Sequence, residues 1–229
     1  MFWNRKPKDP IETCADVLYS ALKGAVTQEG RIRVEDLISA AAAIVGEAAI
    51  AMAGNFDPRQ DDYAPGTRVF STKINPLICD DKSLQQAPTK SIVGDLRARL
   101  VACGFSQTDF PELEGVFKHF AENIGKQEEW GKVPLSIAQQ HHPFVQPLRV
   151  AYETRAIVDS SLSPLGDDKG NRLRATTAVL ARVLCETRDV LNRIIATTLA
   201  IETVNGMAKT APMTGAATAK VMKAVKTRN

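Results

Sequence analysis

The most constraining feature of this sequence is an alanine-rich apolar span that runs from Leu37 to Gly54 and holds one charged residue, Glu47. The span is near the minimum length for crossing a membrane. Alanine is only weakly apolar, however, and the carboxylate lies near the middle of the span. Apolar side chains such as Ile44 and Met52 recur at helical spacing. We therefore expect a helix that is buried on most of its sides at the centre of the fold, and not a transmembrane segment.

Apolar residues at helical spacing also mark several other segments. In chain order these are residues 10–27, 89–105, 109–125, 147–162 and 172–205. The first has a clear start, because Asp9 is a good N-cap and Pro10 suits the first helical position. Glycines end two others, at Gly104 and Gly125. The pattern predicts a mainly α fold, a multi-helix bundle that is built from helical hairpins around the alanine-rich helix.

Residues 55–88 interrupt this pattern with a long stretch that is rich in proline and aspartate. We expect an irregular loop here, with possible short strands at 68–74 and 76–81. Loops of this length are uncommon in compact domains, and they are often functional or disordered. The loop is therefore a candidate wall for a binding site.

The segment 172–205 has the pattern of the longest helix in the chain. At about 1.5 Å per residue it would be roughly 50 Å long, which exceeds the width expected for a domain of this size. Apolar residues run along one side of it, among them Leu173, Leu184 and Ile201. Part of this helix would therefore project from the body or pair with a second chain, and we expect a homo-oligomer that forms through residues 172–205.

The net charge of +3 is unevenly distributed along the 229 residues. Residues 1–10 carry +2 and residues 206–229 carry +5, which leaves −4 on the rest of the chain. We divide the chain into an N-terminal arm at 1–9, a single helical domain at 10–205 and a basic C-terminal tail at 206–229. The mildly acidic body predicts no specific nucleic-acid binding, whereas the basic termini are suited to contact with an anionic surface.

The four cysteines, Cys14, Cys79, Cys103 and Cys185, form no CxxC pair. A chain of this length does not need disulfides in order to fold. We expect reduced and mostly buried thiols. The N-terminal residues also lack the apolar core of a secretory signal, so we expect a cytoplasmic protein.

No complete catalytic signature occurs in the sequence, because the phosphate-binding glycine loops, GxSxG and HExxH are all missing. Glu47 is the most conspicuous candidate site residue, since a carboxylate within an apolar helix is costly to bury unless it is paired or protonated. One interpretation is an acid/base or ligand-anchoring group with a raised pKa. The other is a structural residue that reaches an arginine or lies at the helix margin.

Two of the three histidines, His141 and His142, stand next to each other directly before Pro143. Consecutive side chains point in different directions on either regular element, and proline favours an extended conformation at the residue before it. We interpret the pair as a polar turn. A metal site, or a base that lines a pocket, are the alternatives. On balance the sequence predicts no metal site and no cofactor.

Two functions are compatible with these features. The first is a non-catalytic cytoplasmic interaction or regulatory protein that self-associates through its long helix. The alternative is an enzyme or small-ligand-binding protein whose pocket lies between the alanine-rich helix and the 55–88 loop. The polar groups of that pocket would be Glu47, Arg68, Lys73, His141 and His142.

Overall fold

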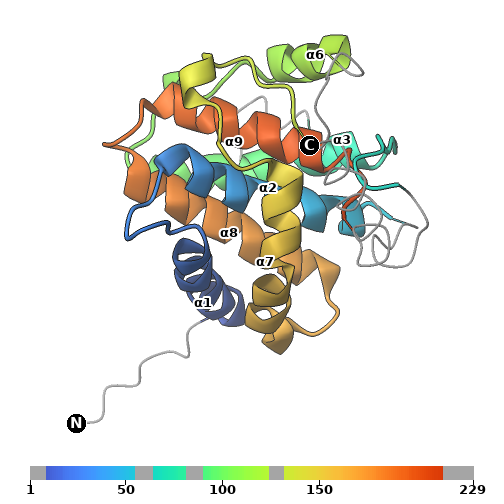
Figure 1. Ribbon diagram of the computed structural model, residues 1–229. Helices are drawn as coiled ribbons and strands as arrows, with labels where there is room; N and C mark the ends of the chain where they lie inside the picture. The colour runs from blue at the N-terminus through green and yellow to red at the C-terminus, as the bar shows by residue number, and fades with distance from the viewer. Residues whose placement is uncertain (1–8, 55–63, 81–89, 124–131, 214–229) are drawn as a thin grey trace, which may run out of the picture.

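The computed structural model describes residues 9–54, 64–80, 90–123 and 132–213. Figure 1 shows helices that pack directly on one another. In chain order the helices are α1 (Pro10–Ala25), α2 (Val34–Met52), α3 (Ile74–Ile78), α5 (Ile92–Ala102), α6 (Leu113–Asn123), α7 (Pro147–Ser161), α8 (Lys169–Thr187) and α9 (Arg193–Met207). Short 3₁₀ turns lie between some of them, namely η1 (Gln107–Asp109), η2 (Gln139–His141) and η3 (Ser163–Leu165). The prediction of a mainly α multi-helix bundle is confirmed.

Helix α2 lies at the centre of the bundle, where it contacts α1, α7, α8 and α9. Its consecutive alanines Ala40, Ala41, Ala42 and Ala43 are all at most 1% exposed. Such small side chains let neighbouring helices approach closely, and dispersion contacts accumulate at short separations. The prediction that the alanine-rich helix is buried is confirmed. None of the described helices combines the length and the apolar character that crossing a membrane requires.

Helix α2 and the end of α9 approach each other very closely at Gly46. A Cβ atom at this position would lie 2.4 Å from Cβ of Met207 and 2.9 Å from both the amide nitrogen of Ala208 and the carbonyl oxygen of Val204. Two of these three contacts are backbone atoms, which cannot move aside as a flexible side chain can. The two helices therefore meet backbone to backbone, and only glycine fits between them.

The prediction of a single helix at 172–205 is wrong, because α8 ends at Thr187 and α9 begins at Arg193. The side chain of Asn192 caps the new helix α9 by accepting hydrogen bonds from the amides of Ile194 at 3.1 Å and Ile195 at 3.5 Å. The break lets α8 and α9 both pack against α2, as Figure 1 shows. The apolar stripe that the sequence assigned to self-association is largely buried within this chain; Leu173, Leu180, Leu184 and Ile201 are all below 9% exposed.

The strands expected in the 55–88 loop do not form in its described part, residues 64–80. Residues 74–78 form the short helix α3 instead, and Arg68 makes an isolated bridge with Thr210. Further backbone hydrogen bonds join residues 66–69 to residues 209–211, with lengths of 2.7 to 2.9 Å. Residues 206–213 are buried in the body, although the sequence analysis placed them in the basic tail. The arm at 1–8 and the tail at 214–229 lie outside the described residues.

A disulfide joins Cys103 at the end of α5 to Cys185 on α8. The prediction of four reduced thiols is therefore wrong for this pair. The two cysteines are 82 residues apart in the sequence, and only the packing of α5 against α8 brings them together. Cys14 and Cys79 are not part of this disulfide, and burial raises the pKa of Cys14.

We expect Gly46→Ala to lower the free energy of unfolding by about 2 kcal/mol or more, because the added methyl group overlaps backbone atoms of α9. Urea unfolding measures the loss. The matched control is Gly24→Ala on the exposed side of α1, where nothing lies within 4 Å of the added carbon. Alanine is the better helix former there, so the control should be neutral or gain up to about 1 kcal/mol. Equal effects of the two substitutions would contradict the close contact.

We expect the double substitution Cys103→Ser, Cys185→Ser to lower the free energy of unfolding by about 2 to 4 kcal/mol, because it frees the long loop that the disulfide closes in the unfolded chain. Denaturant unfolding with and without a thiol reductant measures the effect. The reductant should destabilise the wild type by a similar amount and leave the double variant unchanged. A wild type that is insensitive to the reductant would show that the bond is not formed.

Candidate functional site

Glu47, the one charged residue of the alanine-rich span, forms an ion pair with Arg155 of α7. Oε1 of Glu47 lies 2.9 Å from Nε and 2.6 Å from Nη2 of the guanidinium. Both side chains are mostly buried, with 18% of each exposed. Nη1 of Arg155 also donates a hydrogen bond to the carbonyl oxygen of Met213. Of the two interpretations of Glu47, the one in which it reaches an arginine is confirmed.

This ion pair lines a cleft of about 710 Å³ between α2, α7, η3 and the start of α8. We call it the α7 cleft. Its apolar wall consists of Ile44, Ala48, Ala51, Ala151, Val158 and Leu162. Its charged residues are Glu47, Arg155, Asp159, Asp167, Lys169 and Arg172. The cleft thus combines a smooth aliphatic surface with a charged rim.

A second ion pair, between Asp159 of α7 and Arg172 of α8, also lines the α7 cleft. Nη2 of Arg172 donates to Oδ1 of Asp159 at 2.8 Å. Nη1 of the same residue lies 3.5 Å from the carbonyl oxygen of Leu162 and 3.4 Å from that of Gly166. Gly166 has φ of +59°, a conformation that favours glycine. Arg172 thereby holds the turn between α7 and α8, so the shape of the cleft is largely set before any ligand enters.

The structure does not bring the other predicted site residues to Glu47. His141 Nδ1 lies 3.1 Å from Oε1 of Glu35, and His142 Nε2 lies 2.9 Å from the carbonyl oxygen of Ile137. Glu35 precedes Glu47 by twelve residues on α2, which corresponds to about 18 Å along the helix axis. Burial opposes ionisation of Glu35, but the hydrogen bond with His141 and the charge of Arg33 hold its pKa below the ordinary value.

The two histidines therefore belong to a polar turn, as their interpretation from the sequence predicts. His141 ends the turn η2, and His142 follows it directly. The His141 side chain contacts the first turn of α2, at the opposite end of that helix from the α7 cleft. Among the described residues, no three His, Cys, Asp or Glu side chains gather in a way that would hold a metal ion.

Arg68 and Lys73 also lie apart from the α7 cleft. Arg68 donates hydrogen bonds to Oγ1 of Thr210 and to the carbonyl oxygen of Lys132, and burial lowers its pKa. Lys73 is exposed just before α3. The wall opposite Glu47 is formed by α7 and α8 and not by the described part of the 55–88 loop. The pocket is thus placed differently from the prediction, and Glu47 is the one predicted residue that lines it.

A buried polar row on α9 was missed by the sequence analysis. Glu202, Asn205 and Lys209 are spaced so that they share one face of the helix and its C-terminal end, and all three are below 9% exposed. Glu202 Oε2 accepts a hydrogen bond from the amide of Ser136 at 2.8 Å, and burial raises its pKa. The helical spacing of these polar residues among small and apolar ones was the available signal.

Lys209 is the most unusual member of this row. Its Nζ donates to Oδ1 of Asn205 at 2.7 Å and lies 4.9 Å and 5.1 Å from the ring centres of Phe117 and Phe120. None of the described carboxylates forms an ion pair with it, although a buried lysine normally has such a partner. Burial lowers the pKa of Lys209 to about 8.

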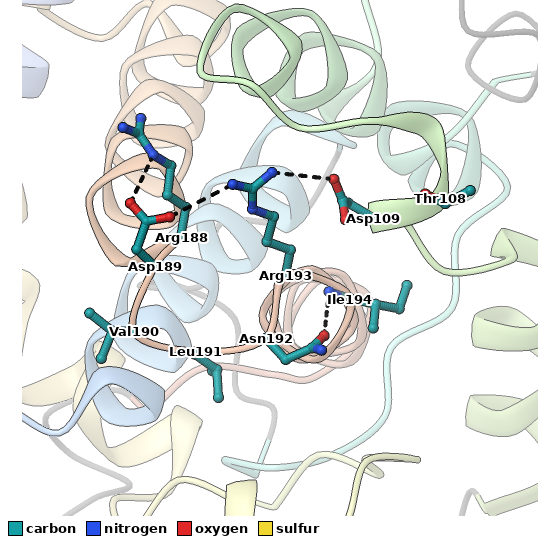
Figure 2. Close-up of a pocket in the computed structure, with 9 residues that line it drawn as sticks. All are labelled: Thr108, Asp109, Arg188, Asp189, Val190, Leu191, Asn192, Arg193 and Ile194. Atoms are coloured by element: carbon teal, nitrogen blue, oxygen red, sulfur yellow. Dashed lines mark hydrogen bonds and ion pairs between the residues drawn. The ribbon is translucent and has the colours of Figure 1, made fainter.

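A polar network at the turn between α8 and α9 forms a third feature. Figure 2 shows the shallow surface depression that this turn makes with η1. Arg188 and Arg193 both contact Asp189, at 3.3 Å and 3.7 Å, and Arg193 also lies 3.8 Å from Asp109. These side chains are between 21% and 74% exposed and are paired with one another, and ion pairs that are open to solvent contribute little to stability.

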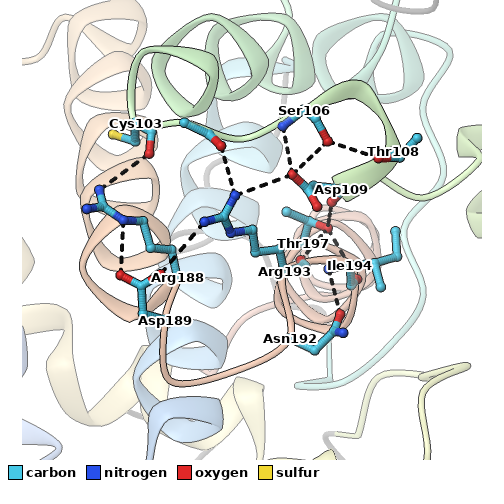
Figure 3. A network of polar contacts seen from close by, with 11 residues as sticks. Cys103, Ser106, Thr108, Asp109, Arg188, Asp189, Asn192, Arg193, Ile194 and Thr197 are labelled. Carbon is cyan, nitrogen blue, oxygen red and sulfur yellow. Dashed lines mark hydrogen bonds and ion pairs between the residues drawn. The ribbon is translucent and has the colours of Figure 1, made fainter.

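The same two arginines cap the C-terminal end of α5, as Figure 3 shows. Arg188 donates to the carbonyl oxygen of Cys103 at 3.3 Å, and Arg193 donates to that of Gly104 at 2.8 Å. Carbonyl groups at a helix end have no partner within the helix, and cations are favourable there. The network lies beside the disulfide of Cys103, and we interpret it as a structural tie between α5, α8 and α9.

We expect Lys209→Met to raise the free energy of unfolding at pH 7 by about 2 kcal/mol, because it removes a buried charge that has no acidic partner among the described residues. An unfolded lysine titrates near pH 10.5, whereas native Lys209 titrates near 8. Between these values the unfolded chain binds the additional proton, so the stability of the wild type rises with pH.

The advantage of Lys209→Met should therefore shrink as the pH rises from 8 to 10. Urea unfolding of both proteins across this range measures it, with the exposed Lys73→Met as control. A difference between wild type and Lys209→Met that stays constant with pH would contradict the lowered pKa.

Comparison with known proteins does not assign any of these features. No protein-family model, no curated protein and no solved structure matches this chain. The role of the site is therefore argued from the contacts, burial and charge of its own residues.

Proposed function

We propose that this protein binds a small amphipathic ligand and that the α7 cleft is the binding site. The observation that carries the proposal is a cleft of about 710 Å³ with an aliphatic wall and a charged rim. Ligand sites commonly have volumes of roughly 300–1,000 Å³ and combine apolar surface with a few fixed polar groups. The proposal keeps the alternative function from the sequence analysis and moves its pocket from the 55–88 loop to α7 and α8.

The charges of the rim favour a zwitterionic or neutral head group. The three acidic residues of the cleft, Glu47, Asp159 and Asp167, are balanced by its three basic residues, Arg155, Lys169 and Arg172. A ligand that carries only a carboxylate would have to compete with Glu47 and Asp159 for the two arginines. A ligand that carries only an ammonium group would have to compete with the arginines for the two acidic side chains. A head group that carries both charges complements both halves of the rim, while a short hydrocarbon chain covers the alanines.

The cleft is better suited to binding than to catalysis. Its hydroxyl groups belong to Ser163 and Thr176, which donate hydrogen bonds to backbone carbonyl oxygens at 2.8 Å and 2.9 Å. Within the described part of the chain, neither hydroxyl is paired with a base that would activate it as a nucleophile. The arginines are likewise engaged in holding α2, α7 and the following turn in place.

Self-association and contact of the basic termini with an anionic surface stay predictions. The stripe expected to mediate self-association is largely buried within the chain, and most of the basic residues of the two ends lie outside the described residues. A cytoplasmic location also stays a prediction. The disulfide between Cys103 and Cys185 weighs against that location, because disulfides persist mainly in oxidising compartments.

The binding proposal is tested with three six-carbon probes that differ in head group: norleucine, hexanoate and hexylamine. Isothermal titration calorimetry should show one site per chain that prefers norleucine over both singly charged probes by at least about tenfold, which corresponds to 1.4 kcal/mol. A ligand that binds only the native state also raises the unfolding temperature, which gives a second readout.

Ala51→Trp fills the cleft from its apolar wall and should abolish binding. Ala98→Trp, on an exposed position of α5, is the matched control and should bind as the wild type does. The proposal fails if none of the probes binds, or if the two tryptophan variants bind equally well while both remain folded by circular dichroism.

A further inference from the structure

We propose that Lys209 is a nucleophilic amine that forms imines with small aldehydes, and that Asn205 positions the carbonyl oxygen of the aldehyde. This inference is independent of the α7 cleft. It rests on the surroundings of one buried amine and on an unsatisfied hydrogen-bond donor beside it.

The side chain of Lys209 is enclosed but not sealed. It is 8% exposed, and the rings of Phe117 and Phe120 flank its Nζ. The guanidinium of Arg68 also lies against Phe120, 5.4 Å from its ring centre. The buried and partly aromatic surroundings of the amine favour a small, uncharged and partly apolar reactant.

Asn205 supplies the second observation. It is 0% exposed, and its Oδ1 accepts the hydrogen bond from Nζ of Lys209. Its Nδ2 is buried and has no hydrogen-bond partner among the described residues. A buried donor without a partner is unfavourable, and an oxygen atom that arrives next to Lys209 would satisfy it. An aldehyde offers an electrophilic carbon to the amine and, one bond away, an oxygen to the amide.

The fraction of reactive amine is high for a lysine. With a pKa of about 8, roughly a quarter of Lys209 is neutral at pH 7.5, compared with about one in a thousand for an ordinary lysine. A lysine that is desolvated in an apolar environment is a recognised nucleophile for carbonyl compounds.

The reaction is balanced without any further reagent. The lone pair of Nζ attacks the carbonyl carbon and the carbonyl π electrons move to the oxygen, which then takes a proton that the nitrogen releases. The hydroxyl group of the resulting carbinolamine leaves as water, with the second proton that the nitrogen releases, while the nitrogen lone pair forms the C=N bond. One aldehyde and one amine thus give one imine and one water, and Nδ2 of Asn205 would hold the oxygen until it leaves.

The test treats the full chain at pH 7.5 with butyraldehyde and cyanoborohydride, which reduces each imine to a stable butylamine. Peptide mass spectrometry then gives the rate at each lysine. We expect Lys209 to be labelled at least tenfold faster than the exposed Lys73 of the same molecule, and Lys209→Arg to lose this adduct. Slower or equal labelling of Lys209 would overturn the proposal.

Asn205→Asp separates the proposed chemistry from mere accessibility. It changes the shape very little, but it gives the ammonium group a carboxylate partner and removes the unsatisfied donor. The rate at Lys209 should fall to that at Lys73 or below, while the same substitution at the exposed Asn75 should leave it unchanged. An undiminished rate in Asn205→Asp, with the fold intact by circular dichroism, would show that Asn205 does not position the reactant and would also overturn the proposal.

Discussion

The backbone contact between α2 and α9 is the constraint on which the other features of this fold depend. It requires glycine at position 46, and alanines occupy many of the other positions of α2. Because these alanines take up little space, α8 and α9 can both pack against α2. For the same reason, α7 can lie close enough for Arg155 to reach Glu47. The small side chains of Ala48 and Ala51 also keep the α7 cleft open, since a larger side chain at either position would fill it.

The charged groups at the α7 cleft and the ammonium group of Lys209 differ in their hydrogen-bond and ion-pair partners. Around the α7 cleft, Glu47 is paired with Arg155 and Asp159 with Arg172, so each charge has a partner that compensates for its loss of water. Just after α9, the ammonium group of Lys209 has a neutral amide as its one hydrogen-bond partner among the described residues. The first arrangement gives a rigid rim that is suited to recognition. The second leaves an amine whose charge is poorly stabilised, which is the usual basis of a reactive lysine.

The disulfide and the arginine network act on the same part of the bundle. The bond between Cys103 and Cys185 fixes the end of α5 against α8, and Arg188 and Arg193 satisfy the carbonyl groups at that helix end. Together they hold the chain where the α8–α9 turn begins. They lie away from the α7 cleft, which indicates that their contribution is to the fold and not to the proposed ligand.

Much of the local structure was determined by the sequence alone. Asp9 and Pro10 start α1 as predicted, with the Asp9 side chain accepting from the amide of Ile11 at 3.0 Å. The alanine-rich helix is buried, the adjacent histidines form a polar turn, and one of the two interpretations of Glu47 was correct. These features depend on capping, periodicity and the cost of burying charge, which act over a few residues and can be recognised in any single segment.

Other features were decided only by tertiary contacts. The apolar periodicity continues through the break at residues 188–192, so the end of α8 became apparent only when both halves were seen to pack on α2. Of the residues expected to form strands, 74–78 form the helix α3, and residues 68–69 form a bridge and a backbone hydrogen bond with the distant residues 209–210. Likewise, the disulfide partners, Arg155 as the partner of Glu47, and the burial of Lys209 all involve segments far apart in the chain. Local pattern cannot specify these pairs, because burial and charge pairing depend on which distant surfaces the packing brings together.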